Sequence, residues 1–339
     1  MTTAISMQSV THDVLEDASQ IETQIMTSRE VDLAHLLDST HHTLLTSDGD
    51  RELVHEALDR LFGGLAIQKA TSTPEEWKTR VQSCRIHPLL ATIHEDPFTY
   101  RAFSKPRGYA GDAQMLDLIY GPEERWPEPE TTPLGLDIYH YTTSAPAAEG
   151  VRARRAFVAD LIDYSSSQNP KQHILAIAAG HLREAILTTA VRRKRFGRFV
   201  ALDVDPTSLE EVDREYGPYG VETVPASFIA LLKSGLDLGK FDLIYSTGLF
   251  DYLNEGIGRR LVTRLFEMLN PGGQLIVANF MPGVRDIGYM EAFMDWNLIY
   301  RTRRDMVNLT TEIDESQVKD LSLFAEDSRN IIFFRMTKR

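Results

Sequence analysis

The chain of 339 residues has little cysteine, fewer basic than acidic residues and no long apolar run. Its single cysteine, Cys84, excludes an internal disulfide framework and a thiolate metal cluster. The net charge of -13 argues against a general binder of nucleic acid or membrane surfaces, because both need a positive protein face. No apolar segment approaches the roughly 20 residues that a membrane-spanning helix requires. We therefore expect no nucleic-acid partner and no membrane partner. Because the first residues lack a signal-peptide pattern, we also expect a cytoplasmic protein.

Motifs for metal binding and nucleophilic catalysis are also missing. His41 and His42 are adjacent, so a helix would point them apart, and no Cys or His partner stands at ligand spacing. Neither a phosphate-binding loop nor a Ser/His/Asp motif is present. The basic run RRKRFGR at 192–198 lies between an expected helix and an expected strand, where cations favour the helix C-terminus. We expect no metal site, and we interpret the basic run as a solvated surface.

Helical periodicity dominates residues 1 to about 115. A helix is expected to start near Ser28, and Gly63-Gly64 is expected to stop or break a helix. Residues 74–84 begin with proline and acids, which is typical of a helix N-terminus. The proline-rich segment 121–135 is interpreted as a loop, either a solvated one or a lid over a site.

From about residue 150, apolar strand candidates alternate with helices, which implies parallel pairing through right-handed crossovers. The last two strand candidates are separated by a short polar break, so they should pair antiparallel. We predict an α/β fold, a Rossmann-like doubly wound and mostly parallel sheet closed by an antiparallel C-terminal strand, with an N-terminal helical domain. The predicted domains are a helical cap (1–120), a linker or lid (121–150) and an α/β domain (151–339).

In such a sheet, ligands bind at the carboxyl ends of the strands. After the first strand come Ala178 to His181, where small residues and Gly180 let a ligand approach the backbone. After the second comes Asp203, which stands roughly twenty residues beyond the glycine turn, the spacing of an acid that binds a ribose diol. Asp205 is the alternative candidate for binding the ribose diol, or it caps the following helix.

The ends of the third and fourth strands offer further polar and small residues. Ala226, Ser227 and Phe228 follow the third strand, where an adenine edge would lie. The candidates after the fourth strand are Ser246, Thr247, Gly248 and Asp251. Each signal alone is weak, but the order and spacing of all four strand ends favour a nucleotide-type site.

The order ILAIAAG, ALDVD, VPASF, FDLIYSTGLFDYL and LNPGGQLIVANF resembles the class I S-adenosylmethionine-dependent methyltransferases over residues 145–339. The resemblance implies that S-adenosylmethionine is the cofactor and that the α/β domain binds it. It also implies that Gly180 and its neighbours contact the methionine part, Asp203 the ribose and Ser227 the adenine surroundings. One departure is that Ala176 or Ala178 replaces the acid that usually ends the first strand. The methionine ammonium must therefore be held by another group.

The segments FSKPRGYAGDAQMLDLIY, SAPAAEGVRARR and MDWNLIYRTRRDM resemble a bacterial subgroup of that family with an N-terminal helical extension. The subgroup includes enzymes that make 3-hydroxy fatty acid methyl esters for signalling. It also includes synthases that cyclise S-adenosylmethionine to azetidine-2-carboxylate. The resemblance therefore implies either methyl transfer to a small molecule or cyclisation of S-adenosylmethionine.

These segments also suggest groups that could contact the cofactor. Tyr109 and Asp112 lie in KPRGYAGD, which is either a charged turn or a loop that folds over the cofactor. One of Arg152, Arg154 and Arg155, with Arg152 preferred, is a candidate for a bidentate bond to the methionine carboxylate. The alternative is that these arginines form a solvated basic face. Tyrosine faces stabilise a sulfonium cation, and Tyr139 and Tyr252 are the first candidates among the tyrosines.

Three functions remain open. The favoured one is methyl transfer from S-adenosylmethionine to the carboxylate, hydroxyl or amine of a small molecule, in bacterial secondary metabolism or signalling. Asp251 or a nearby tyrosine, Tyr139 or Tyr252, would then act where the acceptor must lose a proton. The alternatives are cyclisation of S-adenosylmethionine with release of methylthioadenosine, and a non-catalytic cofactor-binding regulator.

Overall fold

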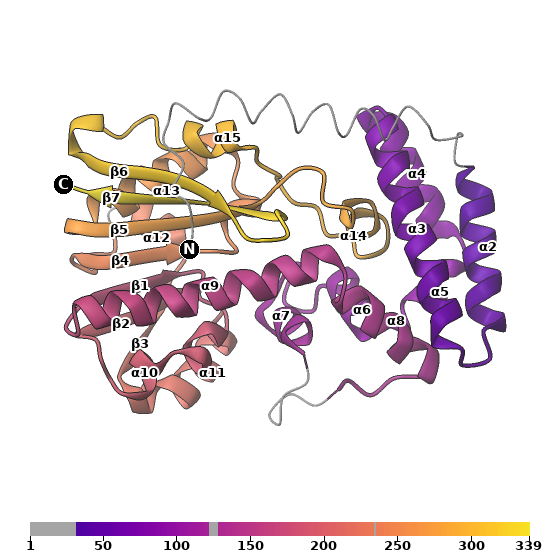
Figure 1. Cartoon of the computed structure of the whole chain (residues 1–339), viewed down its shortest axis with the longest axis horizontal. Helices are drawn as coiled ribbons and strands as arrows, with labels where there is room; N and C mark the ends of the chain where they lie inside the picture. The colour runs from indigo at the N-terminus through magenta and orange to yellow at the C-terminus, as the bar shows by residue number, and fades with distance from the viewer. Residues whose placement is uncertain (1–31, 122–127, 234) are drawn as a thin grey trace. The chain divides into compact units, whose positions relative to one another are not determined.

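The computed structural model describes residues 32–121, 128–233 and 235–339, which form two compact units (Figure 1). The sheet unit comprises residues 150–282 and 298–339. The helical unit comprises the described residues up to 149 together with residues 283–297. The segment 283–297, which the sequence suggested was part of the α/β domain, thus belongs to the helical unit.

The sheet unit is built on seven strands in the order β3-β2-β1-β4-β5-β7-β6 (Figure 1). The strands β1 to β5 pair in parallel, whereas β7 is antiparallel to both β5 and β6. The predicted sheet with an antiparallel C-terminal strand is confirmed. The bounds are β1 His173–Ile177, β2 Arg198–Asp203, β3 Val221–Pro225, β4 Phe241–Ser246, β5 Leu269–Phe280, β6 Val318–Ala325 and β7 Ile331–Lys338.

The central strands are readable from sequence because both of their faces are covered. In β1 and β2 every residue after the first is buried, so both strands appear as continuous apolar runs. Helix α13 (Glu255–Glu267) buries Leu261, Leu265 and Phe266 at helical spacing in the core of this unit. The other helices of the sheet unit are most of α9 (Pro146–Gln168), α10 (Thr189–Arg192), α11 (Pro206–Tyr216), α12 (Phe228–Leu232) and α15 (Arg303–Asn308).

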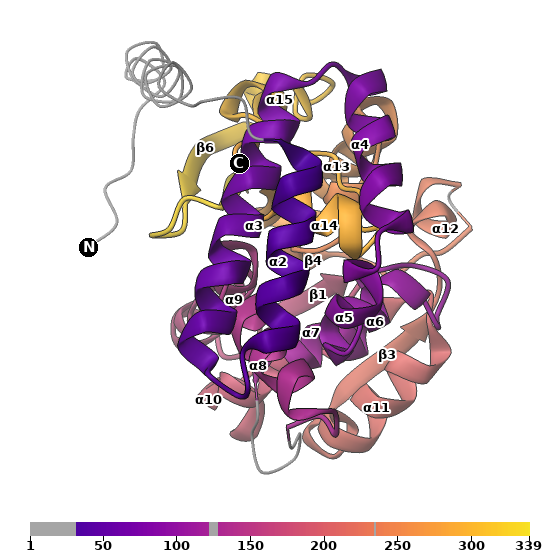
Figure 2. The ribbon, with the colours of Figure 1, turned by 90° about the vertical axis from the view of Figure 1, so that its right-hand side faces the viewer.

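The helical unit contains the helices α2 to α8, the first residues of α9, and α14, and its helices α2 and α3 pack side by side (Figure 2). Helix α14 packs on α3 and α4. The bounds are α2 Leu33–Thr46, α3 Arg51–Thr71, α4 Pro74–Ile86, α5 Leu89–Ile93, α6 Pro97–Ser104, α7 Ala113–Tyr120, α8 Pro133–Thr143 and α14 Ile287–Phe293.

The prediction that Gly63-Gly64 ends a helix is wrong, because α3 continues through both glycines. A Cβ at Gly64 would lie 2.4 Å from Cδ2 of Leu36 in α2. The glycine therefore permits the close approach of two helices, and this packing offsets its low helix propensity of about 1 kcal/mol.

Other local predictions have mixed outcomes. The helix start expected near Ser28 lies outside the described residues, and α2 begins after Asp32, whose carboxylate accepts a hydrogen bond from the Ala34 N–H. Helix α4 is confirmed, with a capping box between Thr73 and Glu76. The end of the segment expected to be a loop, 121–135, already belongs to α8. No helix in the described ranges is both long and apolar enough to cross a membrane.

Candidate functional site

The turn after β1 has an unusual backbone. Ala178, Gly180 and Leu182 all adopt left-handed conformations, with φ of 54°, 53° and 52°. Only one of these positions is a glycine, and a left-handed φ costs other residues about 1 kcal/mol or more. Ala178 is exposed and Gly180 half-buried, so part of the turn's backbone is accessible. Backbone strain held at an accessible turn is typical of functional sites.

The Asp203 carboxylate binds this turn directly. The Gly180 N–H donates to its Oδ2 at 2.8 Å, and the Asp205 N–H donates to its Oδ1 at 2.9 Å. Burial raises the pKa of the Asp203 carboxyl, although these backbone N–H groups oppose the rise. The acid after β2 and the turn after β1, which the sequence only placed at the same sheet edge, are therefore in contact.

Asp205, the rival candidate, caps helix α11. Its carboxylate accepts from the Thr207 N–H at 3.1 Å and from the Ser208 hydroxyl at 2.7 Å. Of the two roles that the sequence allowed for Asp205, the cap is the one for which the structure provides hydrogen bonds.

The end of β3 also adjoins Asp203. The Ala226 N–H donates to the backbone carbonyl of Asp203 at 2.9 Å, which places the start of the segment 226–228 beside the acid. Ser227 directly precedes α12 and Phe228 begins it, and both are half-buried. These residues follow β3 at the same edge as the turn after β1.

After β4, the two predicted polar residues differ in their surroundings. Ser246 is buried, and its hydroxyl donates to the Ile177 carbonyl at 3.1 Å, so it joins the ends of β4 and β1. Thr247 and Gly248 are half-buried. Ser246 thus already has a structural bond, while Thr247 is more accessible.

Asp251 is a buried acid at this edge. Its Oδ1 accepts from the Phe280 N–H at 2.7 Å, and its backbone carbonyl accepts from the Ile299 N–H. Burial raises the pKa of the Asp251 carboxyl to about 6, and the charge of Arg154 opposes the rise. The carboxyl therefore fixes the end of β5, and its pKa lies above the usual range of an aspartate. Its neighbour Tyr252, the other candidate in this turn, is 40% exposed.

Arg154 is the arginine of this segment that the sequence interpretation named but did not prefer. It is 5% exposed, whereas the preferred Arg152 is half-buried. One guanidinium nitrogen of Arg154 lies 3.8 Å from the position of a Cβ added to Gly248. The available signal was periodicity, because Val151, Arg154 and Val158 lie on one buried stripe of α9.

A second carboxyl near Arg154 is Glu184, shortly after the turn. The Tyr245 hydroxyl donates to its Oε1 at 2.6 Å. Burial raises the pKa of Glu184, while the bond from Tyr245 and the charge of Arg154 oppose the rise. The charge of Arg154 therefore acts on both Glu184 and Asp251.

His181, in the turn itself, is buried beside Arg183. Its Nδ1 lies 3.3 Å from a guanidinium nitrogen of Arg183. Arg183 also pairs with Glu211 at 3.0 Å and Glu215 at 2.8 Å, both on α11. This ion cluster secures the segment after the turn to α11.

Three predicted site residues lie in the helical unit. The Tyr139 ring is buried, and its hydroxyl donates to the Leu118 carbonyl at 2.8 Å. Asp112 is fully buried, caps α7, and forms a two-pronged ion pair with Arg101 at 2.9 and 2.7 Å. Tyr109 is half-buried in the preceding turn. For Tyr139 and Asp112 the structure provides structural bonds, and their contact with a cofactor stays a prediction.

No protein-family model matches the sequence, and no curated protein matches it either. Among solved structures it is similar to a "possible exported protein" from Bordetella parapertussis, at 15% identity and a TM-score of 0.53, covering 91% of this chain and 97% of that one. It is also similar to magnesium protoporphyrin IX methyltransferase from Synechocystis PCC 6803 with bound S-adenosylhomocysteine, at 9% identity and a TM-score of 0.47, covering 71% and 98%. A third is the N-methyltransferase NodS from Bradyrhizobium japonicum WM9 in complex with S-adenosylhomocysteine, at 14% identity and a TM-score of 0.42, covering 67% and 97%.

The sheet unit has a Rossmann-like, doubly wound fold that is closed by an antiparallel C-terminal strand. The strand order and the antiparallel β7 establish this directly, and the similarity to the Bordetella protein concerns the fold alone.

Proposed function

We propose that this protein is an S-adenosylmethionine-dependent methyltransferase that acts on a small molecule. The observation that carries the proposal is the bond from the Gly180 N–H to the Asp203 carboxylate. It joins the two segments that the sequence resemblance assigns to the methionine part and to the ribose. Ala226 follows in contact with the same aspartate, at the segment assigned to the adenine.

The residues at this edge fit the cofactor. Each Asp203 oxygen accepts one backbone N–H, and a carboxylate oxygen can accept a second donor, such as a ribose hydroxyl. The accessible turn at Ala178 and Gly180 allows a ligand to approach the backbone closely. Both features support a nucleoside without phosphates, because the turn lacks the several glycines of a dinucleotide site.

The charged residues at this sheet edge have different proposed roles. Asp203 holds the ribose, and Arg154 binds the methionine carboxylate, a task that guanidinium geometry suits. Glu184 and Asp251 are the acids near Arg154, and Glu184 is the proposed replacement for the acid missing from the end of β1. The bound cofactor supplies a methyl group on a positively charged sulfur. Asp251, with its pKa of about 6, is the proposed base where the acceptor must lose a proton.

Product analysis tests the reaction. The full-length protein is incubated with S-adenosylmethionine, first alone and then with pools of small carboxylates, alcohols and amines, and the products are separated by mass spectrometry. The proposal predicts S-adenosylhomocysteine only when an acceptor is present. Methylthioadenosine with azetidine-2-carboxylate in the absence of acceptor would replace methyl transfer by cyclisation. Binding of S-adenosylmethionine without formation of any product would favour the non-catalytic regulator.

A further inference from the structure

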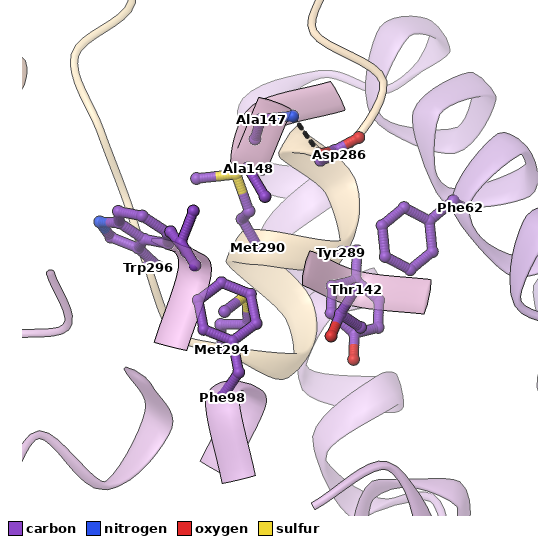
Figure 3. A pocket seen from close by; sticks show the side chains of 11 residues that line it. Phe62, Phe98, Thr142, Ala147, Ala148, Asp286, Tyr289, Met290, Met294 and Trp296 are labelled. Atoms are coloured by element: carbon purple, nitrogen blue, oxygen red, sulfur yellow. Dashed lines mark hydrogen bonds between the residues drawn. The ribbon is translucent and has the colours of Figure 1, made fainter. Parts of the chain in front are cut away.

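The interior of the helical unit around α14 is closely packed (Figure 3). Asp286 lies there and is 3% exposed, and its Oδ2 accepts a hydrogen bond from the Ala147 N–H at 2.6 Å, the dashed line in the figure. The side chains around it leave a volume of about 20 Å³, which holds one water molecule and is too small for an organic ligand. This cavity is therefore part of the core, and a larger one lies in the sheet unit.

The larger cavity is a cleft where β1, β4 and β5 begin, at the edge opposite the candidate cofactor site. Residues from the end of α9, the segment up to β1, the start of β4 and the first half of β5 line it. We call it the amide cleft. Its volume is about 280 Å³, or about 700 Å³ with the part open to solvent, and small-molecule sites span about 300–1,000 Å³. The five residues of β1 separate it from the turn at Gly180 by about 16 Å.

The charges of the amide cleft suit a neutral ligand. No lysine, arginine or histidine is among the described residues that line it, so it offers an anion no counter-charge. Its one acid, Asp242, already has a donor on each carboxylate oxygen. The His173 N–H donates to Oδ2 at 2.7 Å, and the Asn270 side chain donates to Oδ1 at 2.8 Å. Asp242 is thus engaged in holding the starts of β1 and β5, and a cation would have to compete with these bonds.

Side-chain amides dominate the polar lining, and they are Gln168, Asn169, Gln172 and Gln274. No hydrogen bond joins the carboxamide of Gln274 to another described residue. The Asn169 Oδ1 accepts from the Lys171 N–H at 3.1 Å, and its amino group makes no such bond within the described ranges. A carboxamide both donates and accepts hydrogen bonds, as a hydroxyl does, so these groups match a ligand that is rich in hydroxyls.

One wall of the amide cleft is held in place by Gln172, which is 2% exposed. Its side-chain amide donates to the hydroxyls of Ser165 and Ser166 at 2.9 and 2.7 Å, and its carbonyl accepts from the Gly197 N–H at 2.8 Å. These bonds fix the segment between α9 and β1. The cleft is therefore formed before a ligand arrives, which lowers the entropic cost of binding.

Tyr164 adds an exposed aromatic ring to the lining. The residue is 65% exposed, and its hydroxyl forms no hydrogen bond with the part of the chain that the structure describes. A six-membered sugar or cyclitol ring has faces made of C–H groups and hydroxyls around its edge. The C–H groups carry a partial positive charge and pack on the negative face of an aromatic ring. The amide cleft thus combines a surface for the face of such a ring with amides for its edge.

We propose that the amide cleft binds a neutral cyclic polyol the size of a monosaccharide, with its C–H face on Tyr164 and its hydroxyls on Asn169 and Gln274. The site lies entirely in the sheet unit, at the other end of β1 from the turn at Gly180. Its occupancy does not depend on S-adenosylmethionine binding, so loss of one function leaves the other measurable.

Saturation-transfer NMR on the full-length protein tests the proposal with D-glucose, D-galactose, D-mannose and myo-inositol as probes. D-glucitol is the open-chain control, and D-glucuronate is the anionic one. We expect saturable binding of at least one cyclic neutral probe, with a dissociation constant of about 1 mM or lower. D-glucitol and D-glucuronate should bind more weakly, because one lacks the ring face and the other carries a charge that the cleft does not neutralise.

Variants locate the ligand. Tyr164→Ala should weaken the best probe about tenfold or more, because it removes the aromatic face. Gln274→Leu should weaken it about threefold or more, because it keeps the bulk of the side chain and removes the hydrogen bonds. Tyr100→Ala is the matched control, since Tyr100 is a 54% exposed tyrosine of the helical unit. It should leave the dissociation constant within about twofold.

Four results would overturn the proposal. They are the absence of saturable binding by every cyclic neutral probe, unchanged binding by a folded Tyr164→Ala, binding of D-glucitol or D-glucuronate as tight as that of the best cyclic probe, and displacement of that probe by S-adenosylmethionine. Displacement would place the polyol at the cofactor edge of the sheet. Tyr164 is largely exposed, so Tyr164→Ala should fold, and circular dichroism checks this.

Discussion

The backbone N–H of Gly180 donates a 2.8 Å hydrogen bond to the carboxylate of Asp203. The bond connects the turn after β1 to the end of β2, at the sheet edge where doubly wound folds bind ligands. Gly180 has a left-handed φ of 53°, within a turn that also holds Ala178 and Leu182 in left-handed conformations. This turn is the natural starting point for experiments.

Ala178→Gly should stabilise the protein. Glycine adopts the left-handed φ of 54° without the Cβ clash, so the free energy of unfolding should rise by up to about 1 kcal/mol, less the entropy of a freer unfolded state. Urea unfolding measures the change. Ala179→Gly is the control, because Ala179 does not have a positive φ, and it should destabilise. Equal losses in both variants would contradict the strain argument.

Gly288→Ala should destabilise the helical unit by about 1–3 kcal/mol, the range for overpacking. A Cβ there would lie 2.8 Å from the carbonyl carbon and oxygen of Leu65, so α14 could no longer pack closely on α3. Gly63→Ala is the matched control in α3. Its Cβ would meet only the flexible end of Arg285 at 3.4 Å, and helix propensity should make it neutral or stabilising. Thermal unfolding of both variants provides the comparison, and a neutral Gly288→Ala would refute the close packing.

Much of this fold could be predicted from the sequence, because the local signals agree with the tertiary structure. The strands β1 and β2 are buried on both faces and therefore continuous apolar runs, and Thr73 and Glu76 mark the start of α4. The assignment of 283–297 to the helical unit was not predictable in this way. It depends on the contact of Gly288 with Leu65, which is far away in the sequence.

The candidate site, like the fold, could be predicted only in part from the sequence. The residue types after β1 and β2 indicated a nucleotide-type edge, but only the folded structure distinguishes Asp203, which binds the turn, from Asp205, which caps α11. Likewise, the choice between Arg152 and Arg154 depends on which side of α9 faces the sheet. The sequence interpretation weighed helical neighbours but not the apolar stripe that contains Arg154.

Arg154→Lys should weaken S-adenosylmethionine binding about tenfold, since lysine cannot form the bidentate bond to a carboxylate. Arg152→Lys, the control on the same helix, should change the dissociation constant less than about twofold, because Arg152 is not the buried arginine of this helix. Calorimetric titration of S-adenosylmethionine into both variants measures the two dissociation constants and shows which arginine binds the cofactor. A larger loss for Arg152→Lys would restore the original sequence prediction.

Asp286 should make the native state less stable as the pH rises. Its folded pKa of about 6 lies above the ordinary value of 3.8, so the folded state binds the proton more tightly than the unfolded state. This contribution is present below about pH 4 and is lost as the pH rises through 6. It amounts to at most about 3 kcal/mol, from roughly two pKa units at about 1.4 kcal/mol each.

The difference between the wild type and Asp286→Asn isolates this carboxyl from the others. The free energy of unfolding of the wild type, minus that of the variant, should fall between pH 4 and pH 7 in urea titrations. A difference that stays constant or rises with pH would mean that burial does not raise this pKa.

The most direct test of the central claim is a calorimetric titration of S-adenosylmethionine into the wild type, Asp203→Asn and Asp205→Asn. Asparagine is an effective helix cap, so Asp205→Asn should keep α11 and bind within about twofold of the wild type. Asp203→Asn loses the charged acceptor for the ribose and should bind about tenfold to a hundredfold more weakly, the cost of one to two charge-assisted hydrogen bonds. No binding to the wild type, or equal binding by a folded Asp203→Asn, would contradict the account.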